Sequence, residues 1–86
     1  MTEDEIRVRV IKTLSGIVPE LDPGQLKPAV SLRDQLDVDS MDFLNFLIAL
    51  HGEFGVDVPE ADAPKLGTID ACVGYLAQAL RQRAQA

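Results

Sequence analysis

Three stretches of the chain place apolar side chains three or four residues apart, and this spacing constrains the fold most strongly. Such spacing puts the apolar side chains on one face of an α-helix. The three sets are Ile6, Val10, Leu14 and Ile17; then Phe43, Leu47, Leu50 and Phe54; then Ile69, Val73, Leu76 and Leu80. No segment alternates long enough to build a sheet. We therefore predict an all-α fold, a three- to four-helix bundle, with residues 1–86 forming a single domain.

Capping residues and helix breakers define where these helices begin and end. Thr2 and Glu5 have the spacing of a capping box, and Pro19 stops the first helix. Asp39 is expected to cap the second helix, and Gly55 to end it. The expected elements are a helix over residues 3–18, a loop over 19–39, a helix over 40–54, a short helix at about 60–66 and a helix over 69–83.

The connection over residues 19–39 is long for so small a domain, and loops of this length are usually functional. It is rich in proline, but it also contains apolar side chains that can pin it to a core. These are Leu21, Leu26, Val30, Leu32 and Leu36. Residues 31–34 can form a single helical turn.

The predicted helix over 40–54 has more apolar side chains than one face can bury. Phe46 flanks the core stripe, and Met41, Leu44 and Ile48 form a second stripe, rotated by about 120° from the first. Either neighbouring elements cover this second stripe, or it is a partly exposed patch that a partner uses.

The negative charge of the chain lies in its middle third. The sequence has 14 acidic and 8 basic residues, a net charge of −6, and residues 34–62 contain eight of the acids and no Lys or Arg. A chain of this kind is not expected to bind nucleic acid, which requires clustered bases. The acidic segment is either a solvated face or a docking surface for basic partners.

Composition also indicates where the protein works. No apolar run approaches the ~18 residues of a membrane span, so we expect no transmembrane segment. The N-terminal residues lack the features of a secretory signal. Cys72 is the only cysteine, so no intrachain disulfide can form. We expect a cytoplasmic monomer.

The sequence does not contain a set of side chains typical of an enzyme or a metal site. His51 and Cys72 are the only histidine and cysteine, and two such ligands do not make a zinc site. Asp37 and Asp39 fit the first and third positions of a calcium loop, but Ile48 stands where that loop needs its closing acid. We expect a surface or boundary position for His51 and a core position for Cys72.

Asp39-Ser40-Met41-Asp42 places a serine hydroxyl at a helix N-terminus between two carboxylates. A helix N-terminus favours an anion, so a phosphate on Ser40 fits there. Alternatively, Ser40 helps to cap the helix. Ser40 has no general base nearby in the sequence, so another enzyme must activate it if it is modified.

The segment Leu36-Asp37-Val38-Asp39-Ser40-Met41-Asp42-Phe43, together with Phe54-Gly55-Val56-Asp57-Val58-Pro59, resembles the acyl carrier proteins. That family has Asp-Ser-Leu at the start of its second helix, then an acidic-apolar helix and a turn ending in an isoleucine- or valine-proline step. The resemblance spans nearly the whole chain in order and spacing. Met41 takes the place of the usual leucine.

This resemblance implies that Ser40 carries a covalent 4′-phosphopantetheine arm, attached from coenzyme A by a phosphopantetheinyl transferase with magnesium. The arm would carry acyl groups as thioesters among acyl-loading and acyl-processing enzymes with basic docking surfaces. The protein itself would not be an enzyme. The residues implied in docking to partners are Asp39, Met41, Asp42, Leu44 and Ile48.

Two departures from the family pattern bear on the pathway. Asp37 stands where the family often has glycine, and Glu53 is the only glutamate of the second predicted helix. Fatty-acid synthesis is one possible pathway, and a carrier dedicated to a polyketide or a specialised lipid is at least as well supported. An aminoacyl or peptidyl carrier and an unmodified helical adaptor are the alternative functions.

Overall fold

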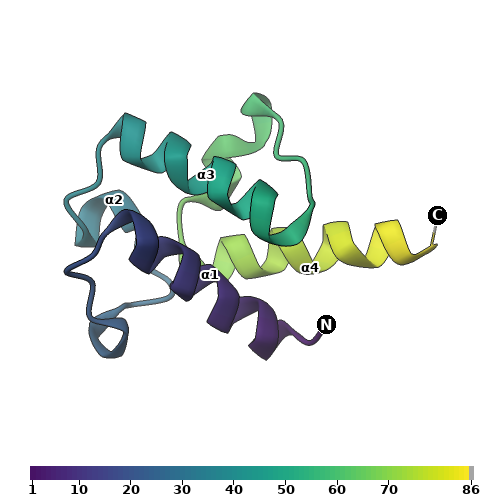
Figure 1. Ribbon diagram of the computed structural model, residues 1–86, viewed down its shortest axis with the longest axis horizontal. Coiled ribbons are helices and arrows are strands. Elements are labelled where there is room, and N and C mark those ends of the chain that lie inside the picture. Colours follow the sequence, from purple (N-terminus) through teal and green to yellow (C-terminus); the bar gives the residue numbers. More distant parts are fainter. Residues whose placement is uncertain (86) are drawn as a thin grey trace.

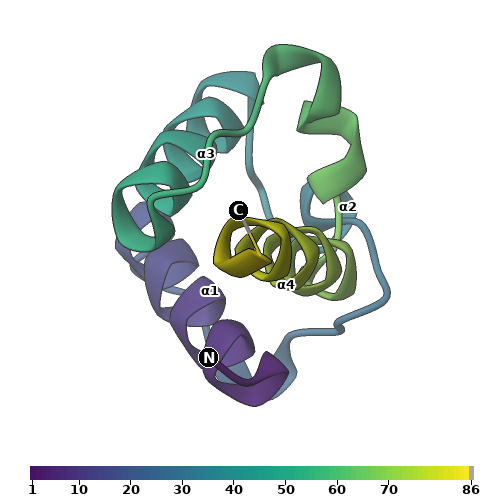
Figure 2. The same cartoon turned by 90° about the vertical axis from the view of Figure 1, so that its right-hand side faces the viewer.

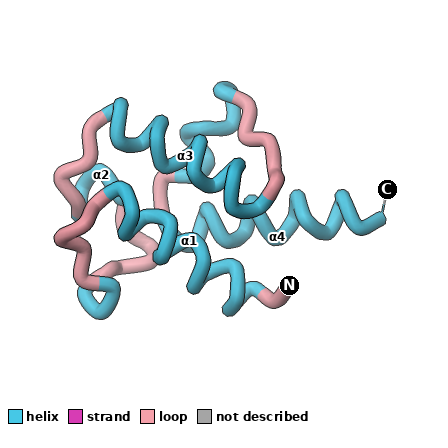
Figure 3. The backbone as a smooth tube through the Cα atoms, viewed as in Figure 1, coloured by secondary structure: helices cyan, strands magenta, loops and turns pink. Residues whose placement is uncertain are grey.

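A computed structural model describes residues 1–85 as a bundle of helices joined by loops (Figure 1). The elements are α1 (Glu3–Ile17), the 3₁₀ helix η1 (Pro23–Gln25), α2 (Leu32–Gln35), α3 (Ser40–Phe54), the 3₁₀ helix η2 (Glu60–Leu66) and α4 (Ile69–Gln85). Figure 3 shows helices and loops and no strand over these residues. The predicted all-α fold is confirmed.

Helix α4 lies in the middle of the bundle, and the other elements surround it. Figure 2 looks along α4 and shows α1, α3 and η2 placed around it. α1 packs against both α3 and α4, while η2 packs against α4. In Figure 1, α3 and α4 run in the same general direction and α1 runs the opposite way. Across the part of the chain that the structure describes, no helix is both long and apolar enough to cross a membrane.

A single cluster of buried side chains fills the space between these helices. Each large apolar side chain that is fully buried contributes about 1.5–3 kcal/mol to folding. The cluster consists of Ile6, Val10, Leu14, Leu32, Phe46, Leu47, Leu50, Phe54, Val56, Leu66, Ile69, Cys72, Val73 and Leu76. It draws on every helix except η1, so even the short elements α2 and η2 are anchored to the bundle.

The expected capping contacts are present at the helix ends. The Thr2 hydroxyl accepts a hydrogen bond from the Glu5 amide at 3.2 Å, and the Glu5 carboxylate accepts from the Thr2 amide at 3.4 Å. Gly55 ends α3 in the left-handed conformation with φ 66°. α1 ends at Ile17, one residue earlier than predicted, because Val18 already leaves the helix before Pro19.

The burial of three side chains differs from the sequence prediction. Phe46, predicted to flank the core, is 1% exposed, whereas Phe43, predicted to belong to the core stripe, is only partly buried. Phe43 lies in the first turn of α3 and Phe46 one turn further in, so position along the helix outweighs angular position. Val30, predicted to be able to pin the loop, is 37% exposed and lies in a turn in which its amide donates to the Lys27 carbonyl at 3.2 Å.

The loop over residues 19–39 is ordered by short helices and by side-chain contacts. α2 lies one residue beyond the predicted turn at 31–34, and its Leu32 is buried. The backbone amide of Leu32 donates to the Gly67 carbonyl at 2.8 Å, and that of Asp70 to the Pro28 carbonyl at 3.0 Å. These bonds tie the loop to the start of α4 and so fix the approach to α3.

Candidate functional site

Ser40 is the first residue of α3, and its side chain is exposed. The cap of the helix is Asp39, whose Oδ1 accepts a hydrogen bond from the Asp42 amide at 2.8 Å. The capping role therefore belongs to Asp39, and the Ser40 hydroxyl is available for other chemistry. The first amides of a helix have no intrahelical acceptor and attract anions, so a phosphodiester on Ser40 suits this position.

The segment before Ser40 is held by one buried side chain. Val38 is 7% exposed, while Asp37 and Asp39 on either side of it are exposed. The Val38 amide donates to the Leu36 carbonyl at 2.9 Å, which tightens the turn. This anchoring holds Ser40 at the surface and points the neighbouring carboxylates outward.

Three of the predicted docking residues form an exposed apolar row on α3. Met41, Leu44 and Ile48 are 63%, 48% and 60% exposed. At about 100° per residue, these three and Ser40 lie within an arc of about 100° on the helix. The structure thus decides between the two interpretations of the second stripe: neighbouring elements leave it largely uncovered.

The two acids beside Ser40 lie together at the N-terminal end of α3, where the Asp42 amide donates to Asp39 Oδ1. Asp39 precedes the helix and is exposed, and Asp42 is partly buried, about 100° around the helix from Met41. Asp39 also caps the helix, so its carboxylate has a structural duty as well as a charge. All six predicted site residues lie in or next to the first three turns of α3.

An apolar groove runs between α3 and the segment that follows it. Its volume is about 630 Å³, and the side chains lining it are Leu44, Leu47, Ile48, His51, Asp57, Val58, Pro59, Glu60 and Ala63. Leu44 and Ile48 belong to both the exposed row and the groove, so the two features are continuous. Sequence reasoning identified the α3 side of this groove but not the side formed by residues 57–63, because nothing in the chain order shows that segment folding back.

His51 lies at the end of the groove that is far from Ser40. Its Nδ1 is 3.1 Å from the Val56 carbonyl oxygen and 3.1 Å from the Asp57 carboxylate. Both are acceptors, so Nδ1 carries a hydrogen and donates it. His51 therefore holds the loop after α3 against the helix through these two contacts. Its side chain is exposed, so its predicted surface position is confirmed.

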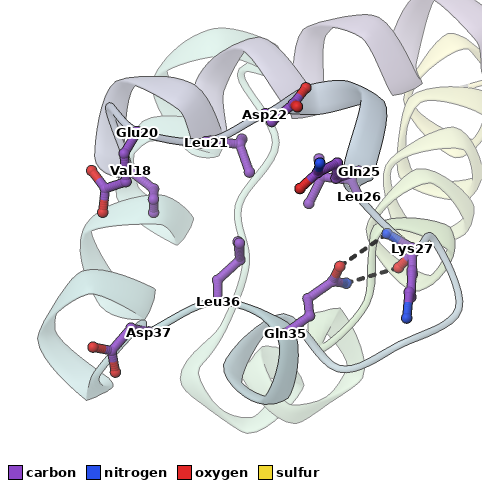
Figure 4. A pocket seen from close by; sticks show the side chains of 10 residues that line it. All are labelled: Val18, Glu20, Leu21, Asp22, Gln25, Leu26, Lys27, Gln35, Leu36 and Asp37. Atoms are coloured by element: carbon purple, nitrogen blue, oxygen red, sulfur yellow. Dashed lines mark hydrogen bonds between the residues drawn. The ribbon is translucent and has the colours of Figure 1, made fainter.

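A second hollow of about 520 Å³ lies beneath the loop between α1 and α2 (Figure 4). The Gln35 side chain spans one side of it: its Oε1 accepts from the Lys27 amide at 2.9 Å, and its Nε2 donates to the Lys27 carbonyl at 2.8 Å. Nε2 also donates to the Val30 carbonyl at 3.0 Å. These three hydrogen bonds hold the loop between α1 and α2 in place, which is a structural role for Gln35.

The chemistry of the remaining candidates is restricted. Cys72 is fully buried, its Sγ lies 3.3 Å from the Leu66 carbonyl oxygen, and burial raises the pKa of its thiol to about 12. A thiol of this pKa is a poor nucleophile at neutral pH. Among the residues the structure describes, no group of three or more His, Cys, Asp or Glu side chains is placed to hold a metal ion.

Comparison with known proteins relates the chain to a family. Residues 8–76 match the family model described as "Phosphopantetheine attachment site". The acyl carrier protein of Chlorobium luteolum is 34% identical over 76 residues, which cover 88% of this chain and 96% of that protein. The acyl carrier protein of Lactobacillus acidophilus is 33% identical over 76 residues, covering 88% and 94%.

Solved structures show the same relationship. The acyl carrier protein of Enterococcus faecalis superposes with a TM-score of 0.72 at 27% identity, covering 92% of this chain and 99% of that one. A candidate acyl carrier protein from Anaplasma phagocytophilum gives a TM-score of 0.79 at 28% identity and covers 91% of each chain. The chain therefore belongs to the acyl carrier protein family, whose members are carriers bearing 4′-phosphopantetheine and not enzymes.

Proposed function

We propose that this protein carries acyl groups as thioesters on a 4′-phosphopantetheine arm attached to Ser40. The observation that carries the proposal is the position of Ser40, exposed at the start of α3 while Asp39 supplies the cap. When attached, the arm supplies the thiol on which the acyl group travels. The phosphodiester would lie at the positive end of the helix dipole.

Ser40 needs help to be modified. His51 is eleven residues further along α3, about 16 Å along the helix axis, and cannot take the Ser40 proton. The Asp39 carboxylate already accepts a hydrogen bond from the Asp42 amide. A phosphopantetheinyl transferase with magnesium would supply the base. The Ser40 oxygen then bonds to the phosphorus of the pantetheine arm of coenzyme A, and adenosine 3′,5′-bisphosphate leaves.

The docking face for partner enzymes is the exposed row of Met41, Leu44 and Ile48, with Asp39 and Asp42 at the N-terminal end of the same helix. These apolar side chains suit an apolar patch on a partner, and the two carboxylates suit basic residues around it. Exposed apolar side chains on one helix face beside the attachment serine are what such an interface requires. The transferase and the acyl-loading and acyl-processing enzymes would share this face.

The groove along α3 supports an apolar cargo. Leu44, on its wall, is one helical turn from Ser40, about 6 Å along the axis. The acyl group is bound to the thiol at the far end of the arm, and with the arm folded back along α3 it would bury apolar surface by lying there. Aminoacyl cargo, which is polar, would gain less from this lining, so the groove favours an acyl carrier over an aminoacyl or peptidyl carrier.

The charge of α3 favours a specialised pathway. Its only glutamate, Glu53, lies 3.5 Å from Arg9 of α1 and so faces away from the docking row. The exposed row of Met41, Leu44 and Ile48 is itself uncharged, which suits partners that recognise shape and apolar area more than charge. We place the carrier in polyketide or specialised lipid synthesis ahead of fatty-acid synthesis. We also propose that it is a cytoplasmic monomer.

The decisive experiment is mass measurement of the intact protein after incubation with a broad-specificity transferase, coenzyme A and magnesium. The expected result is a gain of one phosphopantetheine, lost in Ser40→Ala and kept in Ser31→Ala. Ser31 is a matched control because it is another serine at a helix N-terminus, the residue that precedes α2. Folded protein that gains no mass with several transferases would contradict the carrier and support an unmodified adaptor.

A further inference from the structure

The two walls of the groove belong to different parts of the bundle. One wall is α3, which packs against α1, and the other includes η2, which packs against α4. Figure 2 shows η2 and α3 on different sides of α4. The width of the groove therefore depends on how firmly η2 is held to α4, separately from the packing of α3.

The two ends of η2 are held by different kinds of contact. At its C-terminal end Leu66 is fully buried. The carbonyl of the next residue, Gly67, accepts a hydrogen bond from the Leu32 amide at 2.8 Å. Nearer its N-terminal end, the Tyr75 hydroxyl of α4 donates to Asp62 Oδ2 at 2.7 Å. The other oxygen of Asp62 lies 3.1 Å from Lys65 Nζ. A polar contact thus secures the part of η2 nearest the groove.

The periodicity of a 3₁₀ helix separates the groove side of η2 from the α4 side. Residues three apart lie on the same side of such a helix, so Glu60 and Ala63 share one side and Asp62 and Lys65 another. Glu60 and Ala63 line the groove, whereas Asp62, Lys65 and Tyr75 line a hollow of about 300 Å³ between η2 and α4. Space beside the Asp62–Tyr75 bond leaves this wall able to move when the bond is absent.

We infer that the Asp62–Tyr75 hydrogen bond sets the position of the η2 wall, so that Tyr75 is a positioning residue for the acyl group in the groove. With the bond in place, the wall closes on short acyl chains. Without the bond, a short acyl chain is exposed to solvent. A long acyl chain keeps the η2 wall in place through its own apolar contacts. This inference rests on the proposed carrier function.

The test uses the full chain loaded from butyryl- or dodecanoyl-coenzyme A, with loading verified by intact mass. The rate at which hydroxylamine cleaves each thioester, relative to free acyl-pantetheine, measures how well the protein shelters the acyl group. The variants are Tyr75→Phe and Asp62→Ala. The matched control is Asp70→Asn, which removes the negative charge from the contact of 2.9 Å between Arg7 and Asp70 on another side of α4.

We expect Tyr75→Phe and Asp62→Ala to lower the protection of butyryl about threefold to tenfold, the range given by loss of one hydrogen bond. Dodecanoyl protection should fall less than twofold, and Asp70→Asn should change neither. An unchanged ratio of butyryl to dodecanoyl protection in loaded protein would overturn this inference alone. Failure to load the wild-type chain would overturn the proposed function, and this inference with it.

A second measurement needs no acyl group. The Asp62 amide donates to the Pro59 carbonyl at 2.8 Å, so its hydrogen exchange reports opening at the N-terminal end of η2. In the unloaded, folded Tyr75→Phe variant this amide should exchange about threefold to tenfold faster, with core amides of α1 unchanged. Equal acceleration throughout the chain would mean that Tyr75 supports overall stability only and would overturn its positioning role.

Discussion

Nη1 of Arg83 lies 3.2 Å from the carbonyl oxygen of Gly55 and 3.1 Å from that of Phe54. The last turns of α4 thus supply hydrogen-bond donors to carbonyls at the C-terminal end of α3, a part of the helix that otherwise lacks partners. The contact also closes the space around Gly55, where an added Cβ would lie 3.1 Å from Arg83 Nη1. Gly55 therefore has a left-handed backbone conformation and little space for a side chain.

Gly55→Ala is expected to lower the free energy of unfolding by about 1–2 kcal/mol, the cost of the left-handed conformation for a residue with Cβ. Gly52→Ala is the matched control, because Gly52 is helical and has nothing within 4 Å of an added Cβ. It should raise the free energy of unfolding by about 0.5–1 kcal/mol. Urea denaturation measures both, and equal effects of the same sign would contradict this account of Gly55.

Substitutions of Asp39 should distinguish its capping of α3 from the effect of its negative charge on the transferase. Asp39→Asn keeps a cap oxygen for the Asp42 amide, so stability should change little, while transfer of the arm to Ser40 should slow through loss of a carboxylate. Asp39→Ala should slow transfer and also cost about 1 kcal/mol of stability. Thermal denaturation and initial rates of mass gain distinguish the two. If Asp39→Asn transfers at the wild-type rate, the transferase does not read this charge.

Local patterns predicted the parts of the fold that depend on neighbours in sequence. The capping contacts of Thr2 and Asp39 are made within three residues, and the structure has them where the sequence placed them. The groove wall and the Asp62–Tyr75 bond were not predicted, because they join segments whose contact depends on how the whole chain folds back. The prediction that Phe46 only flanks the core failed for a similar reason, because its burial depends on how α3 packs against α1 and the rest of the core.

Ser40 illustrates the limit for the site as well. Its spacing from Asp39 and Asp42 is local, so the sequence indicated it, and the structure shows it exposed beside a cap that does not require it. The exposure of Met41 was one of two open interpretations. Only the packing of α3 against its neighbours shows which side of this helix stays uncovered.

Cys72 is expected to resist alkylation in the folded protein. Burial raises the pKa of its thiol from 9.0 to about 12, so iodoacetamide at pH 8 meets almost no thiolate, and labelling should follow unfolding. A folded-state pKa above the unfolded value means that stability is intact below pH 9 and falls as pH rises from 9 toward 12. Denaturation midpoints over this range, compared with Cys72→Ala, test the linkage. A Cys72→Ala midpoint with the same alkaline slope would contradict it.

The Asp62–Tyr75 bond should make stability depend on pH at both extremes. The Tyr75 hydroxyl and then Lys65 lower the pKa of Asp62 below 3.8, so its stabilising contribution is present above that pH and lost as pH falls further. The Asp62 carboxylate raises the pKa of Tyr75 above 10.0, so that contribution is lost as pH rises through the raised value. In a Cys72→Ala background, which removes the alkaline contribution of the Cys72 thiol, Tyr75→Phe should flatten both limbs of a plot of urea midpoint against pH. Asp70→Asn in the same background should retain them, and limbs that persist with Tyr75→Phe would assign them to other groups.

The apolar row on α3 should matter for docking and hardly at all for folding. Leu44→Ala and Ile48→Ala remove largely exposed side chains, so the free energy of unfolding should change by less than about 0.5 kcal/mol. Their loss from an interface would cost about 1–2 kcal/mol each, a fivefold to thirtyfold fall in kcat/KM for transfer of the arm. Val8→Ala is the matched control, because Val8 is 67% exposed on α1, away from this row. Leu47→Ala, which opens the core, should instead cost about 2–5 kcal/mol of stability. Transfer kinetics that are equal in Leu44→Ala, Ile48→Ala and Val8→Ala would show that the transferase binds another face of the carrier.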